Sequence, residues 1–217
     1  MIMNNNFDQF KEMLEDFFPA TRIIPISLHE ASKNDADKND IRHFYSGQEL
    51  DLIDMDYLAK KPYKDRRVDS AFQETKDDIV NTADGFIIND KNQWFFIEFK
   101  DCKLDGNKSQ LKNNIIKKAY GNWYMLLDIL YNAEPDKRYI HFYYDNPVKF
   151  AKENVTYILV CNSELNPRVS EQIKNNRFCN KKYTPIFMQK LKEYIFMDAY
   201  VYTEKELERD FVYMFKY

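Results

Sequence analysis

The run WFFIEFK at residues 94–100 constrains the fold more than any other part of the chain. Side chains alternate between the two faces of a β-strand, so Glu98 and Lys100 share one face with two aromatic residues while three apolar residues occupy the other. A strand that is apolar on both faces is typical of a sheet covered on both sides. An unpaired charge in that setting is unfavourable by several kcal/mol. Both charges at the end of this strand therefore need partners.

The preceding run ADGFIIND, residues 83–90, predicts the partner strand, because turn-forming residues at 89–92 join the two runs as a hairpin. A hairpin centred on residue 91 places Asp84 opposite Glu98. Glu98 and Lys100 lie about 6.5–7 Å apart along the strand, too far for the backbone alone to pair them, although the lysine stem can fold back. Two converging carboxylates beside a lysine favour a hard-cation site of the kind that takes Mg²⁺.

The acidic-x-Lys spacing alone carries little information, because the chain contains it at 74–76, 98–100 and 101–103. Only the middle copy ends an apolar strand, and only that copy has an aspartate at the hairpin-matched position. A cation near Glu98, with Lys100 beside it, accounts for both charges. The alternative is a surface ion pair on a solvated sheet face.

The remaining patterns predict an α/β fold with a mixed central sheet flanked by helices. We expect one domain over residues 1–217, with an N-terminal helical extension over about 1–62. Apolar periodicity and capping residues predict helices over 7–18, from about 50 to Lys60, from Ser109 to about 130, and from Thr203 onward. Strands are predicted at about 76–82, 83–90, 92–102, 138–144, 155–161 and 194–202.

Composition favours a globular protein of a reducing compartment. Hydrophobic residues make up 44% of the chain, enough for a core without disulfides, and the three cysteines show no CxxC pairing. No leader-like segment and no long apolar window is present, so we expect a soluble cytoplasmic protein with no membrane partner. His29, His43 and His141 are isolated in the sequence, which gives no support for a zinc site or a histidine-based hydrolase.

Positive charge is concentrated in the segment that begins at the motif. Residues 93–190 carry 16 basic and 10 acidic side chains, whereas residues 1–92 carry 12 and 19. Lys112, Lys117 and Lys118 are predicted to lie on the helix face opposite the apolar one, where they form either a nucleic-acid contact or an ordinary solvated surface. A second basic group, Lys174, Arg177, Lys181 and Lys182, is either a second nucleic-acid contact or an ordinary loop.

ADGFII followed by WFFIEFK resembles the motif of the PD-(D/E)XK nuclease superfamily, over residues 74–130. The resemblance implies a restriction-endonuclease-like αβββαβ core and a Mg²⁺ site, in which Mn²⁺ can substitute. The ligands would be Asp84, Glu98 and the backbone carbonyl of Phe99, and Lys100 would position or activate the attacking water. The proline of the motif is replaced by Ala83. A further acidic ligand is not placed, and the candidates for it are Glu49 and Glu74.

The resulting hypothesis is a metal-dependent nuclease that hydrolyses phosphodiester bonds in DNA and leaves a 5′-phosphate. A bound Mg²⁺ would offset the phosphate charge, supply hydroxide and stabilise the leaving oxygen. The resemblance is compatible with a homodimer. One alternative is a catalytically silent nucleic-acid-binding or protein-interaction module of the same fold, and another is an unrelated α/β interaction domain with a coincidental motif.

Overall fold

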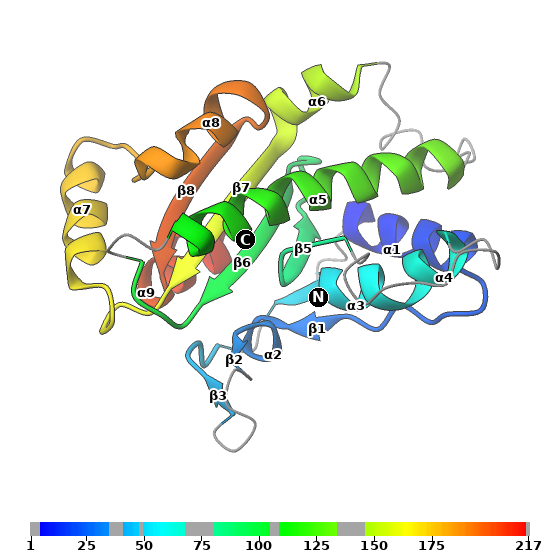
Figure 1. Ribbon diagram of the computed structural model, residues 1–217, viewed down its shortest axis with the longest axis horizontal. Helices are drawn as coiled ribbons and strands as arrows, with labels where there is room; N and C mark the ends of the chain where they lie inside the picture. The colour runs from blue at the N-terminus through cyan, green and yellow to red at the C-terminus, as the bar shows by residue number, and fades with distance from the viewer. Residues whose placement is uncertain are drawn as a thin grey trace.

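A mixed six-stranded sheet forms the centre of the molecule (Figure 1). The computed structural model describes residues 5–34, 41–47, 50–67, 80–104, 109–133 and 146–215. Strands pair in the order β1, β4, β5, β6, β7, β8. The pairs β1–β4, β4–β5 and β5–β6 are antiparallel, and the pairs β6–β7 and β7–β8 are parallel. Their bounds are Ile26–Ser27, Asp51–Asp54, Gly85–Ile88, Trp94–Lys100, Val155–Cys161 and Asp198–Thr203.

Helices cover both faces of this sheet. The longer ones are α1 (Asn5–Phe17), α5 (Ser109–Ala133), α6 (Pro147–Asn154), α7 (Pro167–Phe178) and α8 (Ile186–Tyr194). Short helical turns are α2 (Leu28–Ala31), α3 (Met55–Leu58), α4 (Lys64–Arg67) and α9 (Glu204–Glu206), with π-helical turns at Ala59–Tyr63 and Leu207–Phe211 and a 3₁₀ turn at Val212–Phe215. A small second sheet pairs β2 (Lys33–Asn34) with β3 (Arg42–His43).

The alternation along β6 decides what each face of the sheet packs against. Trp94 contacts Phe10 of α1 and Trp123 of α5 through ring centroids 5.3 and 6.4 Å apart. Phe95, on the opposite face, contacts Phe211 of the C-terminal segment at 5.1 Å. Residues 94–99 are all buried, as expected for a strand covered on both sides.

The predicted hairpin is confirmed. Gly85 pairs with Ile97 and Ile88 pairs with Trp94, which is the register expected for a turn centred on residue 91. The Asp84 N–H donates a hydrogen bond to the Ile97 carbonyl at 3.1 Å, so Asp84 continues the ladder beyond the strand. The hairpin therefore brings Asp84 alongside Glu98.

The expected α/β class and αβββαβ order are present as α1, β4, β5, β6, α5 and β7. The helix predicted from about residue 50 to Lys60 is wrong in its first half, because Leu52 and Ile53 are buried in β4 and only Met55 begins the helical turns. Two strands of the central sheet, β1 and β4, thus come from residues 1–62, where a helical extension was expected.

Other differences concern short elements. The last strand begins at Asp198 rather than at Tyr194, because α8 extends through Tyr194. The helices α6, α7 and α8 were not predicted. The predicted strand 138–144 and most of 76–82 lie outside the described residues, as do Glu49, Glu74 and His141. None of the described helices has the length and apolar character needed to cross a bilayer.

Candidate functional site

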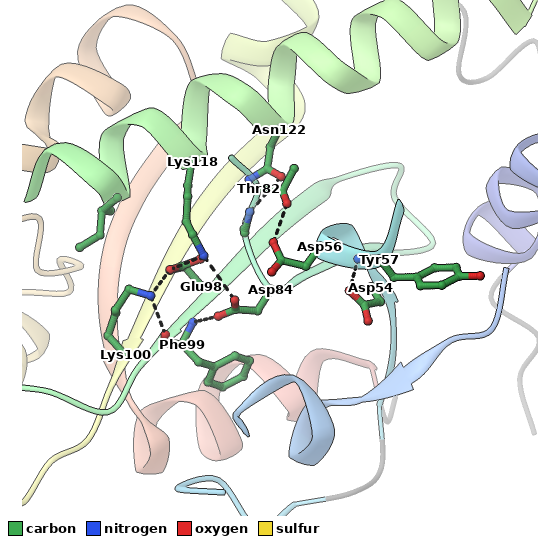
Figure 2. A network of polar contacts seen from close by, with 12 residues as sticks. Asp54, Asp56, Tyr57, Thr82, Asp84, Glu98, Phe99, Lys100, Lys118 and Asn122 are labelled. Carbon is green, nitrogen blue, oxygen red and sulfur yellow. Dashed lines mark hydrogen bonds and ion pairs between the residues drawn. The ribbon is translucent and has the colours of Figure 1, made fainter. Parts of the chain in front are cut away.

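Four charged side chains meet at the C-terminal end of β6 (Figure 2). Glu98 and Lys100 come from β6 itself, and Asp84 comes from the residue directly before β5. Lys118 reaches the same place from α5. The first three are the residues that the sequence predicts to converge, and the structure brings them together.

Glu98 is the buried centre of this cluster, with 0% of its side chain exposed. Lys118 Nζ lies 3.0 Å from each of its two carboxylate oxygens. Lys100 forms an ion pair with Oε1 of Glu98, so its stem does fold back along the strand, and its Nζ also lies 3.3 Å from the Phe99 carbonyl. Neither ammonium is aligned for a hydrogen bond to Oε1, which leaves that buried oxygen without one.

Asp84 sits at the rim of the cluster, with 23% of its side chain exposed. Its Oδ2 accepts a hydrogen bond from the Phe99 N–H at 2.6 Å, and its Oδ1 lies 3.5 Å from Lys118 Nζ. The ammonium of Lys118 therefore lies between the carboxylates of Asp84 and Glu98. The ammonium of Lys118 thus occupies a single cation position between two carboxylates, one from β6 and one from the residue directly before β5.

Burial and charge shift the protonation of these groups. Burial, helped by the negative charge of Glu98, raises the pKa of Asp84 to about 7, although Lys118, Lys100 and the Phe99 N–H act in the opposite direction. Burial by itself would lower the pKa of Lys118, but the charges of Glu98 and Asp84 outweigh it and the pKa is raised. Asp84 is therefore protonated more readily than an ordinary aspartate, whereas Lys118 holds its proton more tightly than an ordinary lysine.

The position of Asp84 is set by the close approach of α5 to residues 81–83. The buried Asn122 side chain of α5 accepts a hydrogen bond from the Ala83 N–H at 3.1 Å. Gly121 lies against the Asn81 carbonyl, and a Cβ at that position would meet the oxygen at 2.1 Å. Only a glycine allows this contact between the helix and the chain that leads into β5.

Asp56 of α3 is a further acidic residue whose charge acts on Lys118, and the sequence patterns did not identify it. Its Oδ1 accepts a hydrogen bond from Thr82 Oγ1 at 2.7 Å, and its Oδ2 pairs with Lys60 Nζ at 2.7 Å. Burial would raise the pKa of Asp56, but these hydrogen bonds and the charge of Lys118 lower it. The sequence contains one indication of this residue: Asp56 follows shortly after the apolar pair Leu52 and Ile53, as expected for an acidic residue near the end of a buried strand. The prediction of a helix from about residue 50 hid this strand.

The predicted nucleic-acid lysines lie in three different environments. Lys118 is 19% exposed and points into the cluster, so its prediction on the outer face of α5 is wrong. Lys117 is exposed, and Lys112 is half-buried with Nζ 6.0 Å from the Phe187 ring centroid. In the second basic group, Nη2 of Arg177 lies 3.6 Å from Oδ1 of Asp210. Arg177 and Asp210 line a pocket of about 290 Å³ together with Lys181 and Lys182.

The predicted ligands form a donor set that suits a hard divalent cation. Carboxylate and carbonyl oxygens are the ligands that Mg²⁺ prefers, and Asp84, Glu98 and the Phe99 carbonyl supply them at the end of β6. An ion between Asp84 and Glu98 would occupy the place that the Lys118 ammonium now takes, so Lys118 must move aside on binding. The residues fit the ion with that rearrangement.

Comparison of the chain with protein-family models, with curated proteins and with solved structures gave no significant match. Functional assignment therefore depends on the geometry of the cluster.

Proposed function

We propose that the protein is a Mg²⁺-dependent nuclease that hydrolyses phosphodiester bonds, with DNA as its substrate and with Mn²⁺ able to substitute. One observation carries the proposal: the carboxylates of Asp84 and Glu98, from adjacent strands, flank a single cation position at the end of a buried strand. Lys100, beside them, has 22% of its side chain exposed and so borders solvent.

Each residue has a separate task in this proposal. Asp84, Glu98 and the Phe99 carbonyl would hold the ion, which supplies charge neutralisation, an activated water and stabilisation of the leaving oxygen. Lys100 orients the attacking water and contributes a fixed positive charge beside the scissile phosphate. Lys118 keeps the two carboxylates together before the ion binds, and its displaced ammonium can then stabilise phosphate charge.

The position of Lys118 favours a second candidate, a catalytically silent nucleic-acid-binding or protein-interaction module. Its ammonium already supplies positive charge to both carboxylates, so the cluster is compensated by the protein itself. In this case the cluster is a structural ion-pair network, and divalent ions would not compete with Lys118.

A cleavage assay separates the two candidates. The purified protein is incubated with plasmid, single- and double-stranded oligonucleotides and RNA in Mg²⁺, in Mn²⁺ and in chelator. We expect metal-dependent cleavage that Asp84→Asn or Lys100→Met lowers by at least about 100-fold, the order found when one transition-state contact is removed. Asp90→Asn, in the exposed hairpin turn, is the matched control and should cleave normally.

The silent-module candidate makes the opposite forecast. The folded wild-type protein would then cleave none of these substrates under any metal, and calorimetry would detect no divalent-ion binding that depends on Asp84. Equal cleavage by wild type and Asp84→Asn would also overturn the nuclease assignment, because the activity would then come from elsewhere.

A further inference from the structure

Two histidines that are 14 positions apart in the sequence meet beside the central sheet. His29 on α2 and His43 on β3 stack with ring centroids 4.2 Å apart and an interplanar angle of 12°. One donor atom from each of His29, Glu30 and His43 lies within 4.8 Å of the other two. The prediction that the histidines are isolated is therefore wrong for this pair, and the β2–β3 pairing explains why.

Hydrogen bonds select the tautomer of both rings. His29 Nδ1 lies 2.7 Å from the Tyr45 carbonyl, and His43 Nδ1 lies 2.9 Å from the His29 carbonyl. A carbonyl oxygen can only accept, so each Nδ1 carries the proton and each neutral ring has its lone pair on Nε2. Metal-binding histidines are held in this way, with one ring N–H donating to a carbonyl or carboxylate.

We propose that His29, Glu30 and His43 form a transition-metal site that takes Zn²⁺. Two imidazole nitrogens and one carboxylate oxygen form a donor set that suits Zn²⁺ and its first-row neighbours better than Mg²⁺ or Ca²⁺. The histidines are half-buried and Glu30 is exposed, so an ion has access from solvent. Water would complete the coordination.

Binding requires a small rearrangement. Zinc–ligand bonds of about 2.0–2.2 Å need donor atoms closer together than in the present cluster, and the parallel rings must tilt so that their lone pairs converge. Glu30, whose side chain is exposed on the four-residue helix α2, can follow the ion at little cost.

The site would fasten α2 to β3 next to the candidate active site. Phe44, which follows His43, packs its ring on Phe99 with centroids 5.6 Å apart. Phe99 is the residue whose N–H binds Asp84. A bound ion would therefore stabilise the chain segment that covers the end of β6, and this structural role does not depend on the proposed nuclease activity.

The test uses the full chain without a histidine tag, after treatment with chelator. Competition with a chromophoric chelator measures Zn²⁺ affinity, Co²⁺ absorption reports the ligand field, and thermal unfolding reports the stability gain. We expect one Zn²⁺ per chain and a raised Tm. His29→Gln and His43→Gln should each weaken the affinity for Zn²⁺ at least 10-fold. Replacing a residue that only hydrogen-bonds to a metal ligand typically weakens binding by about 10- to 100-fold, so the loss of a ligand should have at least the smaller of these effects. Asp90→Asn, in the exposed hairpin turn and outside both clusters, is the matched control and should bind Zn²⁺ normally.

Glu30→Gln provides a variant whose folding is not in question, because the side chain is exposed; its affinity should also fall. X-ray absorption of the wild-type protein with Zn²⁺ should show two imidazole ligands. The proposal is overturned if no stoichiometric Zn²⁺ binds, if the three variants bind as well as wild type, or if the absorption spectrum lacks imidazole ligands.

Discussion

The charged cluster at the end of β6 and the histidine cluster between α2 and β3 differ in how their polar side chains are compensated. Glu98 is fully buried, and two lysines from different elements form ion pairs with its carboxylate. His29 and His43 are half-buried, and a backbone carbonyl accepts a hydrogen bond from one nitrogen of each ring. A buried carboxylate needs an internal counter-charge, whereas a neutral imidazole keeps its donor atom available. The charged cluster must therefore exchange the Lys118 ammonium for a metal ion, whereas the histidine cluster only has to close around one.

Removal of Lys118 should have the largest effect on stability. Lys118→Met leaves the buried Glu98 without its hydrogen-bonded partner, and we expect a loss of about 3 kcal/mol in the free energy of unfolding. Denaturant titration measures it. Lys117→Met, at the neighbouring exposed position, is the control and should change stability by less than about 0.5 kcal/mol. The addition of Glu98→Gln to Lys118→Met should recover part of the loss, because no uncompensated charge remains. Equal losses in the free energy of unfolding from Lys117→Met and Lys118→Met would show that Glu98 does not depend on Lys118 for its compensation.

Asp84 should give the fold a pH dependence of opposite sign to that of an ordinary salt-bridged aspartate. Its folded pKa is about 7, above the unfolded value of 3.8, so between these pH values the folded state binds the additional proton. The wild-type free energy of unfolding, relative to that of Asp84→Asn, should therefore fall as pH rises from about 4 to about 7, by on the order of 2 kcal/mol. Chemical unfolding across this pH range measures the difference, and a rise with pH would contradict the account.

Gly121→Ala should be destabilising, although alanine normally favours a helix interior by about 1 kcal/mol over glycine. The new Cβ would meet the Asn81 carbonyl, so the chain leading into β5 must shift. We expect a net loss of about 1–2 kcal/mol together with weaker metal binding at the β6 cluster and unchanged Zn²⁺ binding at the histidine cluster. Denaturant titration and competition binding measure these effects. A more stable variant would show that the close approach of α5 does not position Asp84.

Glu30→Gln should have the smallest effect on the metal-free protein. The side chain is exposed and offsets no buried charge, so the free energy of unfolding should change by less than about 0.5 kcal/mol. Denaturant titration in chelator measures it. A loss comparable to that from Lys118→Met would mean that the histidine cluster is also an ion-pair network.

Local patterns predicted the parts of the fold that depend on neighbouring residues. The hairpin register followed from the turn residues at 89–92, and the burial of β6 followed from its apolar faces. The long helix α5 and the strand β7 were also predictable, because each has a sustained pattern of its own. Together these elements placed Asp84, Glu98 and Lys100 at one end of the sheet.

The missed features depend on contacts between distant segments. A lysine in a helix is ordinarily read as solvent-facing, and only the packing of α5 over β6 turns Lys118 toward Glu98. The proximity of Asp56 to the site was missed because a capping pattern predicted helix over residues 51–54. Pairing with β5 makes these residues the strand β4, which leads directly into α3 and Asp56. The meeting of His29 and His43 requires the β2–β3 register, which no local periodicity specifies.

Anomalous diffraction from crystals soaked in Mn²⁺ would show directly whether Asp84 and Glu98 hold a divalent cation. We expect a Mn²⁺ peak at coordination distance from oxygens of Asp84 and Glu98, with the Lys118 ammonium displaced from between them. A structure in which Lys118 still bridges the two carboxylates at a Mn²⁺ concentration that occupies other sites would contradict this expectation.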